Sequence, residues 1–141
     1  MTTATKVKNS LTKAQQNLLK KIMPSFKERW GKSAHIDLFE CEHKRLTNPK
    51  ILETFIKKVI KEINMVAHGP VYIDRFGYGD LEGYSAMQFI QTSSITVHLD
   101  EKENRAFIDI FSCKDFDAPK ARDFCKEYFK AKKSNLTTLD R

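Results

Sequence analysis

Four segments with β-type residue patterns follow one another between positions 71 and 113, and this succession constrains the fold more than any other feature of the chain. The segments are Val71 to Arg75, Ser85 to Gln91, Ser93 to His98 and Arg105 to Cys113. They are rich in β-branched and aromatic residues or alternate between apolar and polar residues, as strands do. Only short links separate them, whereas parallel pairing needs a crossover of about a dozen residues or more. The sequence therefore predicts an antiparallel sheet.

Two helices accompany these strands. Asn48 caps the first helix and Pro49 opens it, while Asp117 and Pro119 open the second, which is followed by a polar tail. The first helix carries apolar residues three and four positions apart: Ile51, Leu52, Phe55, Val59, Ile60 and Ile63. Another short strand, His35 to Phe39, precedes both helices. We therefore expect an α+β fold, a two-layer sandwich with an antiparallel sheet of four to five strands and two helices on one face.

The positive charge of the chain is concentrated at its N-terminus. The sequence has 25 Lys and Arg against 18 Asp and Glu, and residues 1–32 hold eight of the basic residues with Glu28 as their only acid. The remaining chain is electrically balanced. We interpret residues 1–30 as a basic N-terminal arm and residues 31–141 as the folded domain.

The arm is expected to be helical from about residue 12. Thr12 and Gln15 form a capping box, and Pro24 would kink or divide the helix that follows. A helix docked on the domain is favoured over an arm that binds nucleic acid, because the basic residues are not interleaved with aromatic residues and no known nucleic-acid motif is present.

Composition excludes several other classes of protein. No stretch approaches 18 consecutive apolar residues, so we expect no membrane-spanning segment. The three cysteines, Cys41, Cys113 and Cys125, are odd in number and show neither metal-ligand spacing nor a disulfide framework. We expect no metal site and a reducing, cytoplasmic location.

The chemistry-bearing residues gather in three short segments. They are Gly83-Tyr-Ser-Ala86, Thr92-Ser-Ser-Ile-Thr-Val-His98 and Phe107-Ile-Asp-Ile-Phe-Ser-Cys113. Serine, histidine and cysteine recur in nucleophilic sites, although each of them also has ordinary structural uses in strands and turns. In their joint spacing, these segments resemble those of the prokaryotic S-adenosylmethionine decarboxylases. The resemblance extends more loosely from about residue 31 to 130 and leaves out the arm.

This resemblance implies a role for each of four residues. Ser93 would become the pyruvoyl cofactor of a self-cleaving enzyme after the chain is cut between Thr92 and Ser93. Ser85 and His98 would assist the cleavage, because the acyl shift needs a stabilised intermediate and a base. Cys113 would return a proton to the substrate carbon after carbon dioxide leaves, since a cysteine thiol is mostly protonated at neutral pH. The pyruvoyl group would form a Schiff base with the substrate and act as the electron sink.

Three departures from the family pattern affect this interpretation. Thr92 replaces the usual glutamate before the reactive serine, so cleavage could be slow or absent. Leu99-Asp-Glu101 replaces a Trp-Pro-Glu segment, which makes Glu101 the expected partner of the substrate ribose. The loop before Ser85 is longer, and Phe76 is the expected aromatic for adenine stacking.

The resemblance implies S-adenosylmethionine as the substrate, a place in spermidine biosynthesis, and a homodimer of cleaved protomers with sites shared across the interface. Three alternatives remain open at this stage. The substrate could be arginine or ornithine, because the altered Leu99-Asp-Glu101 segment lies where the nucleoside is recognised. The chain could instead be an uncleaved, non-catalytic homologue that binds a metabolite or a partner subunit. Nucleic-acid binding through the basic arm is the third and the least supported.

Overall fold

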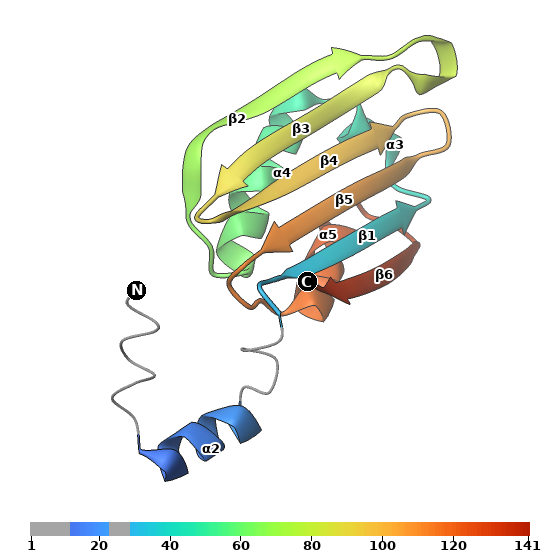
Figure 1. The fold of residues 1–141 in the computed structure, drawn as a ribbon. Coiled ribbons are helices and arrows are strands. Elements are labelled where there is room, and N and C mark those ends of the chain that lie inside the picture. The colour runs from blue at the N-terminus through green and yellow to red at the C-terminus, as the bar shows by residue number, and fades with distance from the viewer. Residues whose placement is uncertain (1–11, 23–28) are drawn as a thin grey trace. The chain divides into compact units, whose positions relative to one another are not determined.

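The computed structural model of the chain describes residues 12–22 and 29–141. The chain divides into two compact units, residues 1–30 and residues 31–141, which we describe separately. The second unit contains a six-stranded antiparallel sheet in the order β2-β3-β4-β5-β1-β6 (Figure 1). Its strands are β1 (Lys32–Phe39), β2 (Ala67–Phe76), β3 (Gly83–Ile90), β4 (Ser93–Asp100), β5 (Arg105–Ser112) and β6 (Lys133–Asp140). Its helices are α3 (His43–Leu46), α4 (Pro49–Glu62), the 3-10 turn η1 (Gly79–Leu81) and α5 (Ala118–Tyr128).

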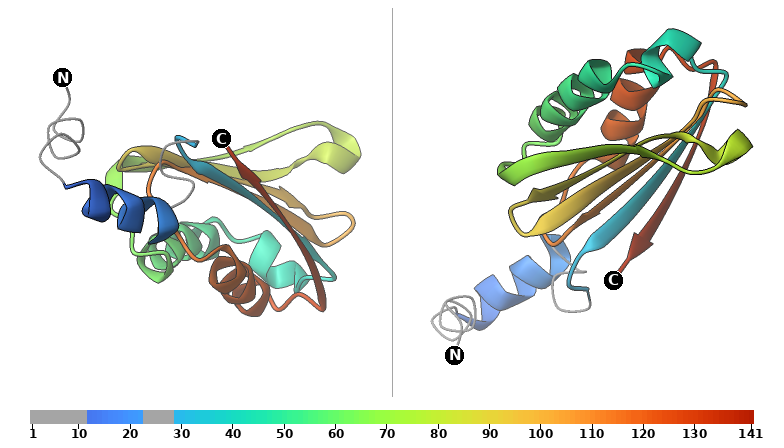
Figure 2. Two further views of the ribbon diagram at one scale, coloured as in Figure 1. Left: turned by 60° about the horizontal axis from the view of Figure 1, so that its bottom comes forward. Right: turned by 90° about the horizontal axis from the view of Figure 1, so that it is seen from above.

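Helices α4 and α5 cover one face of the sheet, which gives the two-layer α+β sandwich expected from the sequence (Figure 2). Alternate residues of β4 are buried toward the helices, namely Ile95, Val97 and Leu99. Facing them are fully buried residues of α4 and α5 such as Phe55 and Cys125. The other face of the sheet, which we call the open face, carries no helix of the second unit.

The sheet has six strands, so the expectation of four to five was wrong. β6 was taken for part of a polar tail, because its sequence Lys-Ser-Asn-Leu-Thr-Thr-Leu-Asp lacks apolar alternation. It pairs with β1 along its whole length, from Lys32 opposite Asp140 to Phe39 opposite Lys133. An edge strand needs little apolar surface, and here only Leu136 packs against the core.

The predicted helix signals act as expected. The side chain of Asn48 accepts a hydrogen bond from the Lys50 N–H at 3.0 Å, and Pro49 opens α4. The side chain of Asp117 accepts one from the Lys120 N–H at 3.0 Å at the start of α5.

In the first unit, α2 spans Lys13–Ile22 and begins at the predicted capping box. The Thr12 N–H donates to Gln15 Oε1 at 2.9 Å, and the Gln15 N–H donates to Thr12 Oγ1 at 3.2 Å. The predicted kink at Pro24 lies outside the described residues. Among the described residues, no helix is long and apolar enough to cross a membrane.

Candidate active site

The structure divides the predicted site residues between the two ends of β4. Thr92, Ser93 and Cys113 lie together where β4 begins, and we call them the cleavage cluster. Ser85, His98, Phe76 and Glu101 lie toward the other end, and we call them the histidine cluster. Figure 1 shows the β3–β4 turn, which holds Thr92, at the end of the sheet opposite the β2–β3 and β4–β5 loops.

Strand register builds the cleavage cluster. Ser93 pairs with Ile90 on one side and with Ser112 on the other, so Cys113, the residue that follows β5, comes to lie beside Thr92. The Thr92 hydroxyl is hydrogen-bonded to the Cys113 thiol. The Cys113 backbone N–H donates to Ser93 Oγ at 3.3 Å. Both residues of the proposed scissile bond are therefore held by Cys113.

A close backbone approach supports this end of the sheet. A Cβ atom on Gly31 would lie 2.6 Å from the Ser112 carbonyl oxygen and 3.2 Å from the Cys113 Cα. Only glycine leaves room for this contact without a shift of the backbone. Ser112 itself is fully buried, and its hydroxyl accepts the Lys114 N–H at 3.0 Å. These contacts limit movement of the backbone on both sides of Cys113.

Neighbouring strands build the histidine cluster. Ser85 of β3 lies directly opposite His98 of β4, and Ser85 Oγ is 2.9 Å from His98 Nδ1. Asp74 of β2 lies opposite Ser85 in the same row of the sheet. Residues directly opposite in an antiparallel pair project to the same face. Here that is the open face, where the His98 side chain is exposed.

The two clusters are far apart within one chain. Five residues of continuous strand separate Ser93 from His98, which corresponds to about 16 Å at the usual rise per residue. A turn or bulge at Ser93 would let its side chain face the same way as that of His98, but β4 contains neither. Ser93 is already paired with both neighbouring strands, and no register shift occurs along β4. His98 therefore cannot reach the Thr92–Ser93 bond of its own chain without rearrangement of the sheet.

The expected substrate residues belong to the histidine cluster. Phe76 ends β2 and is 57% exposed, so its ring is available for stacking. The Glu101 carboxylate is bound by both terminal nitrogens of the Arg75 guanidinium, one of them at 3.0 Å. The hydrogen bonds and charge of Glu101 raise the pKa of Arg75 above its ordinary value.

Arg75 was missed by sequence reasoning. Its Nε also lies 3.4 Å from Glu82, and its guanidinium lies 5.0 Å from the centre of the Tyr84 ring. Its contact with Glu101 depends on a loop that joins two other strands, and only its position one residue before Phe76 could have drawn attention to it.

The other two cysteines are structural. Cys41 and Cys125 are buried, and burial raises the pKa of Cys41 to about 11 and also raises the pKa of Cys125. A buried thiol of raised pKa is a poor nucleophile. Cys113 is only half-buried. Of the three thiols, Cys113 is therefore the one placed for chemistry.

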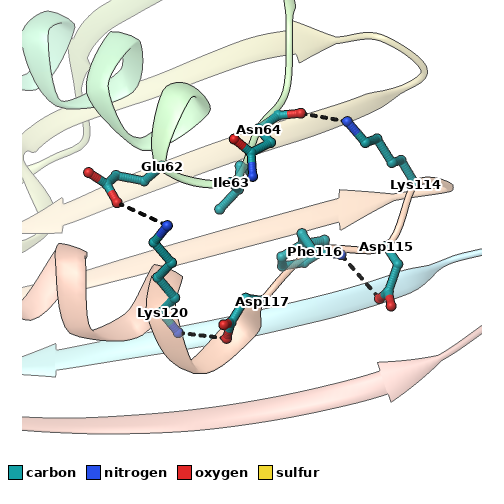
Figure 3. Close-up of a pocket in the computed structure, with 8 residues that line it drawn as sticks. All are labelled: Glu62, Ile63, Asn64, Lys114, Asp115, Phe116, Asp117 and Lys120. Atoms are coloured by element: carbon teal, nitrogen blue, oxygen red, sulfur yellow. Dashed lines mark hydrogen bonds and ion pairs between the residues drawn. The ribbon is translucent and has the colours of Figure 1, made fainter.

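A hollow of about 540 Å³ lies between the end of α4 and the segment that follows Cys113 (Figure 3). Lys114 Nζ donates to the Asn64 carbonyl at 2.7 Å. Lys120 Nζ lies 3.8 Å from Glu62 Oε2. Because both lysines are already engaged with the protein, we assign this hollow no part in the site.

Comparison with known proteins identifies relatives of this chain. A curated S-adenosylmethionine decarboxylase proenzyme from Sulfolobus acidocaldarius is 30% identical over 112 residues, covering 79% of this chain and 88% of that protein. One from Clostridium botulinum (strain Loch Maree / Type A3) is 29% identical over 105 residues, covering 74% and 87%. The crystal structure of the adenosylmethionine decarboxylase from Aquifex aeolicus VF5 matches with a TM-score of 0.69 at 16% identity, covering 80% of this chain and 91% of that one, and shows a shared fold.

The family profile described as S-adenosylmethionine decarboxylase matches residues 32–141. That range includes both clusters and leaves out the whole basic N-terminal arm, residues 1–30. The match confirms the decarboxylase interpretation drawn from the sequence motifs. The chain therefore belongs to the S-adenosylmethionine decarboxylase family.

Proposed function

We propose that this protein is a proenzyme that cuts itself between Thr92 and Ser93 and then decarboxylates S-adenosylmethionine for polyamine biosynthesis. The observation that carries this proposal is that one residue, Cys113, is hydrogen-bonded to both residues of the proposed scissile bond, Thr92 and Ser93. The names of the relatives support the same substrate, since the curated proteins are S-adenosylmethionine decarboxylase proenzymes.

Cleavage uses the chain's own residues. Ser93 Oγ attacks the Thr92 carbonyl carbon, and the amide becomes an ester as the C–N bond breaks. A base then removes the Ser93 Cα proton and the Cβ–O bond breaks, which leaves a carboxylate on Thr92. The dehydroalanine formed at position 93 takes up water and releases ammonia to give the pyruvoyl group. The Ser85–His98 pair supplies a hydroxyl and an imidazole suited to stabilising the intermediate and moving the protons.

The separation of the clusters supports a homodimer with shared sites. Ser85 and His98 form one row that projects to the open face. Thr92 and Cys113 are the chain neighbours of Ser93 and Ser112, whose row projects to the helix-covered face, so extending the alternation by one residue places them on the open face. We propose that two copies stack through this face in opposite directions, so that the histidine cluster of each copy meets the cleavage cluster of the other. A two-fold axis makes both sites equivalent. Three exposed apolar residues of the open face would be buried in such a dimer: Tyr72, Met87 and Phe89.

The residues of the cleavage cluster fit a pyruvoyl group, because Ser93 follows directly on a turn and has a half-buried thiol beside it. Once formed, that group supplies a ketone that binds the substrate amine and accepts the electron pair left by carbon dioxide. Cys113 donates the proton that the substrate carbon then needs. Phe76 stacks on the adenine, while Glu101, held by Arg75, accepts hydrogen bonds from the ribose hydroxyls. The three free cysteines favour work in the reducing cytoplasm.

Release of labelled carbon dioxide tests this function. Purified protein should release it from carboxyl-labelled S-adenosylmethionine, and not from arginine or ornithine labelled in the same way. Ser93→Ala is the matched control and should be inactive, because it cannot form the pyruvoyl group. Release from arginine or ornithine alone would show that an amino acid is the substrate. Absence of release from all three substrates would show that the protein is a non-catalytic homologue.

A further inference from the structure

Thr92 has a contact that its position in the scissile bond does not require. It lies in the two-residue turn between β3 and β4, and its hydroxyl is hydrogen-bonded to the thiol of Cys113, which follows β5. A backbone hydrogen bond also fixes the turn, since the Gln91 N–H donates to the Val66 carbonyl at 2.9 Å. The carbonyl that Ser93 must attack therefore belongs to a residue fixed through its side chain.

Either group of this pair could be the donor. We take the Cys113 thiol as the donor, because a hydroxyl oxygen accepts a hydrogen bond better than sulfur does. Thr92 is exposed, which leaves water to accept its own hydroxyl proton. Because the Thr92 hydroxyl is neutral, it places no charge beside the Cys113 thiol.

We propose that Thr92 is a positioning residue for self-cleavage, in that its hydroxyl binds the Cys113 thiol and so holds the scissile carbonyl against the Ser93 hydroxyl. This inference rests on the proposed function. It assigns the Thr92 side chain a part in the reaction in addition to the carbonyl that its backbone contributes. Cys113 also holds the attacking oxygen, because its backbone N–H donates to Ser93 Oγ at 3.3 Å. Cys113 therefore positions both reacting groups, the Thr92 carbonyl and the Ser93 hydroxyl.

The size of the effect follows from the role of alignment. A single neutral hydrogen bond contributes enough to change a rate by about three- to tenfold. A displacement of the reacting atoms by about 1 Å costs up to about a hundredfold. Thr92→Val keeps the branched shape and removes the hydroxyl, so we expect it to slow cleavage at least about threefold. Thr92→Ser keeps the hydroxyl and should recover most of the rate.

The experiment follows the cleavage rate of freshly made chains by intact mass, which does not depend on decarboxylation. Thr138→Val is the matched control, since Thr138 is exposed on the edge strand β6 opposite the buried Ala34, away from the open face and the scissile bond, and it should cleave like the natural chain. In a Cys113→Ala background, which we expect to permit cleavage, Thr92→Val should cause no further slowing. Equal rates for the natural chain and Thr92→Val, or the same slowing by Thr92→Val with and without Cys113, would overturn the proposal.

A second measurement reads the bond in an uncleaved chain. In Ser93→Ala protein, the infrared S–H stretch of Cys113 is identified as the band lost on Cys113→Ala substitution. Thr92→Val should move that band toward the frequency of a thiol without an acceptor, whereas Thr92→Ser should not. An unmoved band would contradict the inference. Failure of the natural chain to cleave would instead refute the proposed function, and the infrared comparison would still decide whether the bond exists.

Discussion

The distance between the two clusters predicts that cleavage takes place in trans, between two copies of the chain. His98 lies five strand residues, or about 16 Å, from Ser93 of its own chain. Ser93→Ala removes the attacking hydroxyl and His98→Ala removes the base, so neither variant should cleave when expressed alone. His98 is exposed, and its replacement should not unfold the protein. Co-expression of the two variants should restore cleavage.

The restored amount follows from symmetry. If the two variants pair at random, about half of the dimers are mixed. Each mixed dimer has one site with Ser93 from the His98→Ala chain and His98 from the other chain, while its second site lacks both. About half of the His98→Ala chains should therefore be cut, and the Ser93→Ala chains should remain whole.

The assay separates the two variants by tags of different mass and measures each by intact-mass spectrometry. Co-expression of the natural chain with Ser93→Ala is the control, and there every natural chain should be cut. If neither variant is cleaved in the mixture although mixed dimers are isolated through the two tags, the reasoning from strand geometry is refuted and the site lies within a single chain.

Three further predictions concern separate parts of the chain. His98→Ala should slow cleavage about a hundred- to ten-thousand-fold, whereas Cys113→Ala should be cut but decarboxylate more slowly per pyruvoyl group by a similar factor; normal turnover per pyruvoyl in the second variant would remove Cys113 from the mechanism. Deletion of residues 1–10 should leave cleavage and turnover nearly unchanged, and loss of cleavage in a folded deletion variant would show that the basic segment is needed. Because burial raises the pKa of Cys41 to about 11, its contribution to the free energy of unfolding should be fully retained below pH ~8.5 and fall by about 1.4 kcal/mol per pH unit as the pH rises between these values, in addition to the fall caused by Cys125. Cys41→Ala should make the slope shallower by that amount in urea denaturation at several pH values, and an unchanged slope would contradict the assignment.

The sequence was sufficient for those parts of the fold that depend on local signals. Asn48 and Asp117 mark helix starts because a cap is a contact between residues two or three positions apart. The central strands were recognisable because their alternation reflects one buried and one open face. β6 escaped recognition because an edge strand is stabilised by backbone pairing, here with β1, and needs no apolar pattern of its own.

The site was predictable as a set of residues and not as an arrangement. Spacing along the chain brought Ser85, Ser93, His98 and Cys113 together as a motif. Ser93 and His98 are five residues apart in β4, so their side chains face opposite ways. Their assignment to two clusters depends on the register of three strands. The bonds between Thr92 and Cys113 and between Arg75 and Glu101 likewise join residues that only the assembled sheet brings together.

The most direct test of the account is the mass of the purified chain under denaturing conditions. We expect two fragments of 92 and 49 residues, the larger ending at Thr92. The smaller should carry a pyruvoyl group in place of Ser93 and should resist Edman sequencing, because it has no free amino terminus. A single intact chain of 141 residues after prolonged incubation would contradict the central claim that this protein makes its own cofactor.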